Sequence, residues 1–255
     1  MTHRLNLVLA MLALLVGLPY YVLLLANPSR DVAPHSLRVT DLRQLAQSVP
    51  GPRPVAIEGT VVAWGRTPTT LLAAGAGLKR RLYTVMSYRL AVPGGAPIVI
   101  DTGSAGAASS TWLETYLADR QRLVDADLAA ARLVVTTSAS PEALGGLARL
   151  GQRTAGHAIS AKAVLGPAQV SAATRLGLKP GATLGPQPQA VAPGVVVIPA
   201  GAPTADAQMI YVQLGDGREY LFAGPVAPYA VNAAQLRTRS RLLDWWSGHE
   251  DRSGA

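Results

Sequence analysis

The chain has 255 residues, of which 49% are hydrophobic and 15% are charged. This balance excludes an intrinsically disordered protein, because disordered chains have few apolar residues and a high net charge. There is no cysteine, so disulfides, thiolate metal sites and cysteine nucleophiles are excluded as well. A metal ion would have to be held by the four histidines and the 15 Asp and Glu residues.

Basic residues outnumber acidic ones, and the formal net charge is +8. They are spread along the chain, with one short run at Lys79, Arg80 and Arg81. A nucleic-acid-binding protein usually gathers its basic residues on one face or one helix. We therefore expect no nucleic-acid partner. The short run is either solvated or meets anionic lipid head groups.

Residues 7–26 contain no charge, and as a helix they would be about 30 Å long, which matches the hydrocarbon core of a bilayer. A buried core helix is usually amphipathic. A cleaved signal peptide, the other alternative, ends in a small-x-small pattern, which the Leu24, Leu25, Ala26 end of this stretch lacks. We therefore expect residues 1–27 to be an uncleaved signal anchor that crosses the membrane once.

The charges that flank this stretch are balanced, with Arg4 before it and Arg30 and Arg38 after it. They set only a small positive-inside bias. A first span so near the N-terminus usually exports the rest of the chain. We expect the globular part to lie on the extracytoplasmic side.

We expect residues 28–54 to hold a linker and a first strand or helix, and residues 55–255 to form one domain. In this domain short β-rich runs alternate with helical ones, which predicts a layered α/β sandwich. The predicted strands are 55–64, 82–92, 97–101, 131–137, 195–199, 208–213 and 219–223. The predicted helices are 111–124, 141–150, 168–176 and 232–246.

Two segments of this domain form a recognisable frame. Residues 98–103 read Ile-Val-Ile-Asp-Thr-Gly, and residues 137–146, directly after a predicted strand, read Thr-Ser-Ala-Ser-Pro-Glu-Ala-Leu-Gly-Gly. This frame resembles the metallo-β-lactamase fold hydrolases, which carry Thr-His-x-His-Pro-Asp-His-x-Gly-Gly at this point. The resemblance implies an αββα sandwich whose strand-to-helix loop grips one or two zinc ions. The family's three histidine places and its aspartate place are taken by Ser138, Ser140, Ala143 and Glu142 respectively.

Later landmarks of the family are substituted too. Pro203 stands where the resemblance places a histidine ligand, and Pro225 where it places the aspartate that bridges the metals. The last family histidine lies on a strand beyond the final helices, and we expect that strand to be missing, since the sequence stops at Ala255. Its absence would leave Trp245 and Trp246 exposed as an anchor or partner site.

These substitutions decide the functional expectation. Zinc needs three or four nitrogen or carboxylate donors, and Ser, Ala and Pro are poor or impossible ones. The four histidines, at positions 3, 35, 157 and 249, are outside the motif. We expect no cofactor and no catalysis, and instead a membrane-anchored pseudoenzyme that binds a ligand or a protein partner. A plain membrane-tethered structural module is a further alternative.

An enzyme remains the rival hypothesis, as a hydrolase with a carboxylate metal site built from Asp101, Glu142 and Asp206. Metal-free catalysis would need Ser138 or Ser140 as the nucleophile and Glu142 as its base. The order Ser140, Pro141, Glu142 is more simply typical of a helix N-terminus, with Pro in the first turn and an acidic side chain near the helix dipole.

Overall fold

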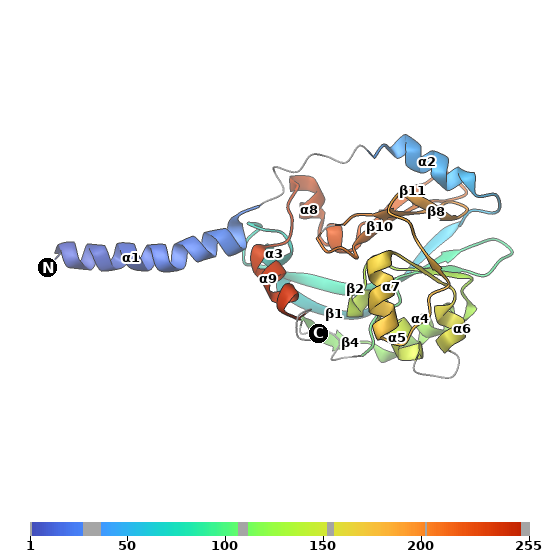
Figure 1. Ribbon diagram of the computed structural model, residues 1–255, viewed down its shortest axis with the longest axis horizontal. Coiled ribbons are helices and arrows are strands. Elements are labelled where there is room, and N and C mark those ends of the chain that lie inside the picture. The colour runs from blue at the N-terminus through green and yellow to red at the C-terminus, as the bar shows by residue number, and fades with distance from the viewer. Residues whose placement is uncertain (1, 28–36, 107–111, 152–155, 202, 251–255) are drawn as a thin grey trace. The chain divides into compact units, whose positions relative to one another are not determined.

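The computed structural model describes residues 2–27, 37–106, 112–151, 156–201 and 203–250 (Figure 1). The chain forms two compact units, each built from segments far apart in sequence. The helical unit comprises residues 1–34, 67–81 and 227–255, and the sandwich unit comprises residues 35–66 and 82–226.

The sandwich unit contains two sheets. The strands of the seven-stranded sheet are β1 (Ala56–Pro68), β2 (Arg80–Ala91), β3 (Ile98–Ile100), β4 (Leu113–Tyr116), β5 (Leu133–Val135), β6 (Ala163–Leu165) and β7 (Ala182–Thr183). The strands of the four-stranded sheet are β8 (Gln189–Ala192), β9 (Val195–Pro199), β10 (Gln208–Gln213) and β11 (Glu219–Phe222). The helices of this unit are α2 (Val39–Ser48), α4 (Ala118–Ala130), α5 (Pro141–Gly151), α6 (Gly156–Ser160), α7 (Pro167–Arg175) and the short 3-10 helix η3 (Gly224–Val226).

The larger sheet has the order β4-β1-β2-β3-β5-β6-β7, and its half from β3 to β7 is parallel. β3 also pairs antiparallel with β2, through the predicted hairpin at residues 93–95. The smaller sheet, β11-β10-β9-β8, is antiparallel throughout. Because β3 and β5 are parallel neighbours, the loops after these two strands leave the same edge of the sheet.

Alternate side chains of these strands belong to different layers, as the period of a strand requires. Val99 and Val134 pack under α4, α5 and α7. Ile98 and Ile100 point the other way, into the core between the sheets. The edge-to-face pair of Tyr88 and Phe222, with ring centroids 4.7 Å apart, belongs to this middle core.

The far face of the smaller sheet is covered by α2, where Leu42 and Ala46 pack against Val196 and Ile198. Helices therefore cover both outer faces of the paired sheets (Figure 1). This is the α/β sandwich expected from sequence, with α2 as its outer helix layer.

The predicted helix over residues 111–124 is wrong in its first half. Leu113 to Tyr116 form β4, which pairs with β1 in the register Ala63 to Tyr116, and α4 begins only at Ala118. The spacing of the apolar residues in this segment fits the period of a helix or that of a strand. The segment forms a strand because the edge of β1 is available for pairing. Thr111 lies outside the described residues.

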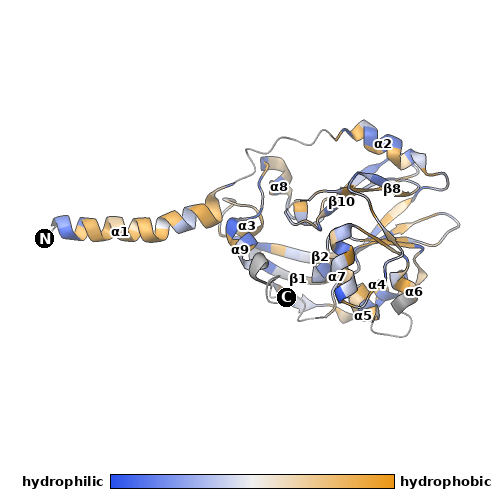
Figure 2. Cartoon of the chain, viewed as in Figure 1, coloured by the Kyte–Doolittle hydropathy of each residue, from blue (hydrophilic) through white to orange (hydrophobic). Residues whose placement is uncertain are grey.

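The helical unit begins with α1 (Thr2–Tyr20), which continues as a π-helical turn, η1 (Tyr21–Leu25). Residues 3–25 are long and apolar enough to cross a membrane, and most of α1 after its polar first turn is hydrophobic (Figure 2). The unit also contains α3 (Thr69–Leu72), α8 (Ala230–Gln235) and α9 (Arg241–Glu250).

The single helix predicted over residues 232–246 is two helices. Leu236 takes a left-handed conformation with φ 49°, which ends α8. The linking residues bond elsewhere in the unit: the Thr238 carbonyl accepts the Ala74 N–H at 2.8 Å, and the Ser240 N–H donates to the Leu71 carbonyl at 2.9 Å. These long-range bonds replace the helical ones.

Candidate functional site

The candidate site is the loop between β5 and α5, residues 136–140, together with the segments that hold it. Asp101 follows β3 on the neighbouring parallel strand. Its Oδ1 accepts the Thr137 N–H at 2.6 Å, and its Oδ2 accepts the Thr137 hydroxyl at 2.9 Å. One carboxylate thus satisfies both donors of Thr137, the second residue of the loop.

Asp101 is held in the left-handed region, with φ 56°, where Asp and Asn are tolerated better than other residues with a side chain. Its own N–H donates to the Val135 carbonyl at 3.0 Å, which ties the ends of the two strands together. Burial raises the pKa of the Asp101 carboxyl to about 6, although the two hydrogen bonds from Thr137 act in the opposite direction.

The next three residues of the loop are also held by hydrogen bonds. The hydroxyls of Ser138 and Ser140 lie 3.0 Å apart and are bonded to each other, and Ser138 is buried. Between them, the Ala139 N–H donates to Oδ2 of Asp206 at 2.5 Å. Asp206 comes from the segment before β10, so the smaller sheet contributes to the loop.

Two buried glutamines complete this framework, and the sequence analysis missed them. Gln169 of α7 donates from Nε2 to the carbonyls of Thr136 and Asp206, at 3.2 and 3.0 Å. Gln208 of β10 donates to Oε1 of Gln169 at 3.0 Å. Gln169 Oε1 accepts the Gly166 N–H at 3.1 Å, so Gln169 occupies the third position of a helix that starts at Gly166-Pro167. This helix start is visible in the sequence and could have indicated Gln169, whereas no sequence signal indicates Gln208.

The start of α5 places two further motif residues. The Ser140 carbonyl accepts the N–H groups of Ala143 and Leu144, at 3.0 and 2.9 Å, so Ser140 begins the helix as predicted. Ala143 is buried, and its carbonyl accepts both donors of Thr102. Glu142 is partly exposed in the first turn.

The glycine pair of α5 allows the helix to approach the loop after β3. A Cβ on Gly146 would lie 1.9 Å from the Thr102 carbonyl oxygen, and one on Gly145 would lie 2.3 Å from the Ala105 nitrogen. Only glycine fits at this contact.

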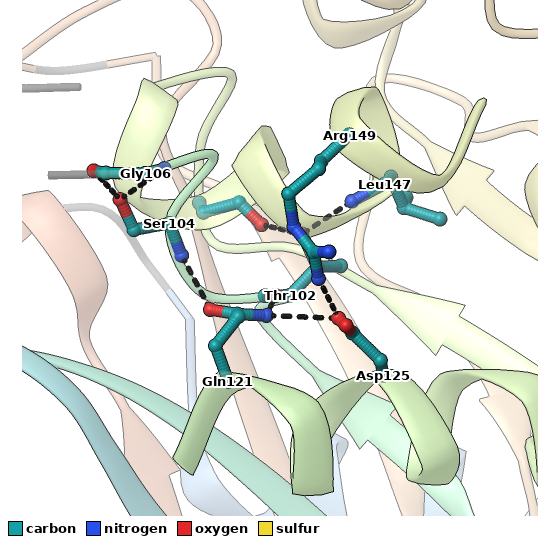
Figure 3. Close-up of polar contacts among 8 residues, drawn as sticks. Thr102, Ser104, Gly106, Gln121, Asp125, Leu147 and Arg149 are labelled. Atoms are coloured by element: carbon teal, nitrogen blue, oxygen red, sulfur yellow. Dashed lines mark hydrogen bonds and ion pairs between the residues drawn. The ribbon is translucent and has the colours of Figure 1, made fainter. Parts of the chain in front are cut away.

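A polar network from α4 and α5 holds the same loop (Figure 3). The Gln121 side chain accepts the Ser104 N–H at 3.0 Å and donates to the Thr102 carbonyl at 3.1 Å. It also donates to Asp125, which forms an ion pair with Arg149. The loop after β3 is therefore fixed by side chains that the sequence did not single out, Gln121 above all.

Of the two prolines, Pro225 lies in η3, directly after Gly224. Gly224 has φ 51°, and a Cβ there would lie 2.4 Å from Cβ of Thr137, so this segment packs on the loop. Pro203 lies in the segment before β10 and is partly buried. Neither proline has a side-chain donor atom.

Comparisons with known proteins agree with this architecture. No protein-family model matches the sequence, and no curated protein matches it. Solved structures do match. An N-acyl homoserine lactone hydrolase, with the product N-hexanoyl-L-homoserine bound at its catalytic metal centre, superimposes with a TM-score of 0.57 at 12% identity, over 79% of this chain and 88% of that one.

Two others give the same result. A probable metal-dependent hydrolase from Staphylococcus aureus has a TM-score of 0.57 at 12% identity, over 75% of this chain and 80% of that one. A quorum-quenching N-acyl homoserine lactone lactonase has a TM-score of 0.52 at 14% identity, over 66% and 72%. The chain has the metallo-β-lactamase fold.

The zinc that this fold implies does not fit the residues present. At the places that the motif assigns to ligands, the side chains are hydroxyl, methyl or proline groups, apart from Glu142. Among residues that the structure describes, no group of three or more His, Asp or Glu could hold a metal ion. Of the three carboxylates in the rival hypothesis, Asp101 accepts the Thr137 N–H and Asp206 accepts the Ala139 N–H.

The histidines do not change this result. His3 lies in α1 and is exposed. His157 belongs to α6, where sequence predicts a loop, and His249 belongs to α9 near the end of the chain. His35 lies outside the described residues.

Proposed function

We propose that this chain is a membrane-anchored protein of the metallo-β-lactamase fold that has lost the zinc site and acts by binding a ligand or a protein partner. The proposal rests on one observation: both aspartates near the loop are hydrogen-bond acceptors for loop residues. Asp101 and Asp206 accept hydrogen bonds from Thr137 and Ala139. Hydrogen bonds thus hold the loop in place of a metal.

A metal would have to break these bonds. A carboxylate ligates a metal in its deprotonated form, and burial acts against that form at Asp101. Releasing Thr137 or Ala139 would also leave a backbone N–H in a largely buried loop without a partner, at a cost of about 1–3 kcal/mol each. The side chains at the ligand positions of the motif would form too few bonds to a metal to offset that cost.

The anchor is the second part of the proposal. α1 and η1 would cross the bilayer through residues 7–26, and the sandwich unit would lie on the extracytoplasmic side. The apolar, uncharged surface of this helix supports the span. We test it by washing membranes with alkaline carbonate, which we expect to leave the chain in the pellet. Release into the supernatant would contradict the anchor.

The loss of zinc is tested by elemental analysis of the full chain, purified in detergent without chelator. We expect zinc, iron and manganese far below one ion per chain, before and after incubation with zinc and desalting. Hydrolysis of N-hexanoyl homoserine lactone, a substrate of the kind named for the neighbouring structures, should not exceed the buffer rate. A stoichiometric metal, or turnover that a chelator abolishes, would establish the hydrolase instead.

A further inference from the structure

The C-terminal end of the apolar helix is bonded into the rest of the helical unit. The Leu24 carbonyl accepts the Gly75 N–H at 2.9 Å and the Thr70 hydroxyl at 2.8 Å. Close behind it in the chain, the Asn27 side chain donates to the Leu236 carbonyl at 2.9 Å and accepts the Thr238 N–H at 3.2 Å. Residues 69–81 and 229–246, which we call the collar, are thereby attached to the last turn of the helix.

The lengths place the collar relative to a bilayer. Side chains from His3 to Tyr21 are exposed, whereas those from Val22 to Asn27 are partly covered by protein. Arg4 is charged and belongs in the opposite head-group layer, so the hydrocarbon core begins after it. A core of about 30 Å takes about 20 residues at 1.5 Å per residue, so it ends near Leu24. The elements bonded to Leu24 then lie at the boundary with the head-group layer.

The collar has the aromatic residues expected of that layer. Trp245 and Trp246 of α9 are 60% and 48% exposed, and α9 packs against η1 (Figure 1). Tyr20 and Tyr21 are exposed at the same end of the span. Trp and Tyr are enriched at membrane interfaces because the ring is apolar while its N–H or O–H group stays hydrated.

The collar is also basic. Lys79, Arg80, Arg81 and Arg241 are exposed. Arg239 is paired with Asp244, the single acidic residue in the sequence of these two segments. At an anionic lipid surface each exposed Lys or Arg favours the bound state by about fivefold.

We propose that the collar is a lipid-binding surface that lies in the head-group layer of an anionic phospholipid bilayer, with Trp245 and Trp246 at the level of the upper acyl chains. The inference rests on the proposed span. Sequence alone left open whether Trp245 and Trp246 contact lipid or a protein partner. The proposal assigns them to lipid.

The test uses the full chain reconstituted into phosphatidylcholine vesicles, with and without phosphatidylglycerol. Flotation after a carbonate wash reports the span. Quenching of tryptophan fluorescence by lipids brominated near the top of the acyl chain reports the collar. Trp64 and Trp112 give a constant background in every variant.

We expect strong quenching that disappears in W245F/W246F and is greater with phosphatidylglycerol. The variant K79Q/R80Q/R81Q should lose that lipid dependence, since three charges at about fivefold each change the binding equilibrium about 100-fold. The control R120Q/R175Q/K179Q removes the same charge from exposed positions of the sandwich unit. It should behave as the original chain. Circular dichroism checks that each variant is folded.

The outcomes separate the two proposals. If the chain is stripped from the vesicles by carbonate, the span fails, and the collar fails with it. If the chain floats but W245F/W246F is quenched as much as the original, the collar alone is overturned. Equal quenching in the two lipids, or the same loss in both triple variants, overturns its assignment to anionic lipid.

Discussion

Asp101 holds Thr137 by two hydrogen bonds, from the backbone N–H at 2.6 Å and from the hydroxyl at 2.9 Å. The two residues follow neighbouring parallel strands and are 36 positions apart. This carboxylate therefore ties the loop after β5 to the end of β3. In a metallo-β-lactamase fold this loop is the place where the motif supplies its first metal ligands.

Asp101→Asn should remove a pH dependence of stability. Burial raises the pKa of Asp101 to about 6 in the folded chain, whereas the unfolded value is near 3.8. As the pH rises from about 4 to about 6, the unfolded chain loses this proton first, so the folded state is destabilised by up to about 3 kcal/mol. Asn stays neutral and tolerates the left-handed backbone.

Denaturant melts of both proteins in detergent at a series of pH values measure this effect. Other groups titrate equally in the two proteins, so the difference between their free energies of unfolding is the readout. It should shift in favour of Asn as the pH rises through this window and stay constant above it. A difference independent of pH would contradict the raised pKa.

Asp206→Ala should lower the stability of the chain, whereas adding a chelator to the original chain should not. The variant leaves the Ala139 N–H without its acceptor, which costs about 1–3 kcal/mol. Adding EDTA to the original chain should leave its melting temperature unchanged, because hydrogen bonds hold the loop. A drop in melting temperature with EDTA, reversed by zinc, would show a structural metal.

Gly224→Ala should be costly for two separable reasons. Both Gly224 and Gly217 have positive φ, 51° and 89°, so either substitution by Ala incurs backbone strain of about 1 kcal/mol. The new Cβ at position 224 would also lie 2.4 Å from Cβ of Thr137, whereas nothing lies within 4 Å at position 217. Chemical denaturation should show a loss larger by about 1–3 kcal/mol at Gly224. Equal losses would mean that η3 does not pack on Thr137.

Asp125→Ala should destabilise the sandwich by about 2–3 kcal/mol. The change leaves the Arg149 guanidinium largely buried without its partner and removes an acceptor of Gln121 (Figure 3). Asp119→Ala breaks a pair on the same helix whose side chains are 73% and 87% exposed, and should cost at most about 0.5 kcal/mol. Thermal melts of the two variants compare the pairs. Similar losses would argue against the network of Figure 3.

Glu142→Gln tests the remaining carboxylate of the motif. The side chain is partly exposed in the first turn of α5, so removing its charge should cost no more than about 1 kcal/mol of helix-dipole stabilisation. Lactone hydrolysis by the variant should equal that of the original chain. Turnover in the original that disappears in the variant would identify Glu142 as catalytic.

Local patterns were sufficient for much of the fold. The uncharged stretch of residues 7–26 predicts the apolar helix, since length and composition alone decide whether a helix can span a bilayer. The runs that became β3, β5 and β9 are apolar over their whole length, as strands covered on both faces are. The order of these elements, with the Gly145-Gly146 pair, was sufficient to suggest the fold.

The same patterns failed where tertiary pairing decides. Leu113 to Tyr116 became a strand because β1 offered an edge, and the last helix broke at Leu236 because residues 71–74 compete for its hydrogen bonds. Neither partner is near in sequence, so no local pattern could reveal it.

The candidate site divides in the same way. Sequence by itself determined which donors are missing, because Ala and Pro side chains have no ligand atom and the Ser hydroxyl is a poor zinc ligand in any conformation. Only the tertiary structure decided that Asp101 and Asp206 hold Thr137 and Ala139, across separations of 36 and 67 residues. Such contacts depend on which strands pair and how the two sheets stack. The physical reason is that the ability to ligate a metal depends on the side chain itself. A hydrogen bond between distant residues depends on how the fold places them.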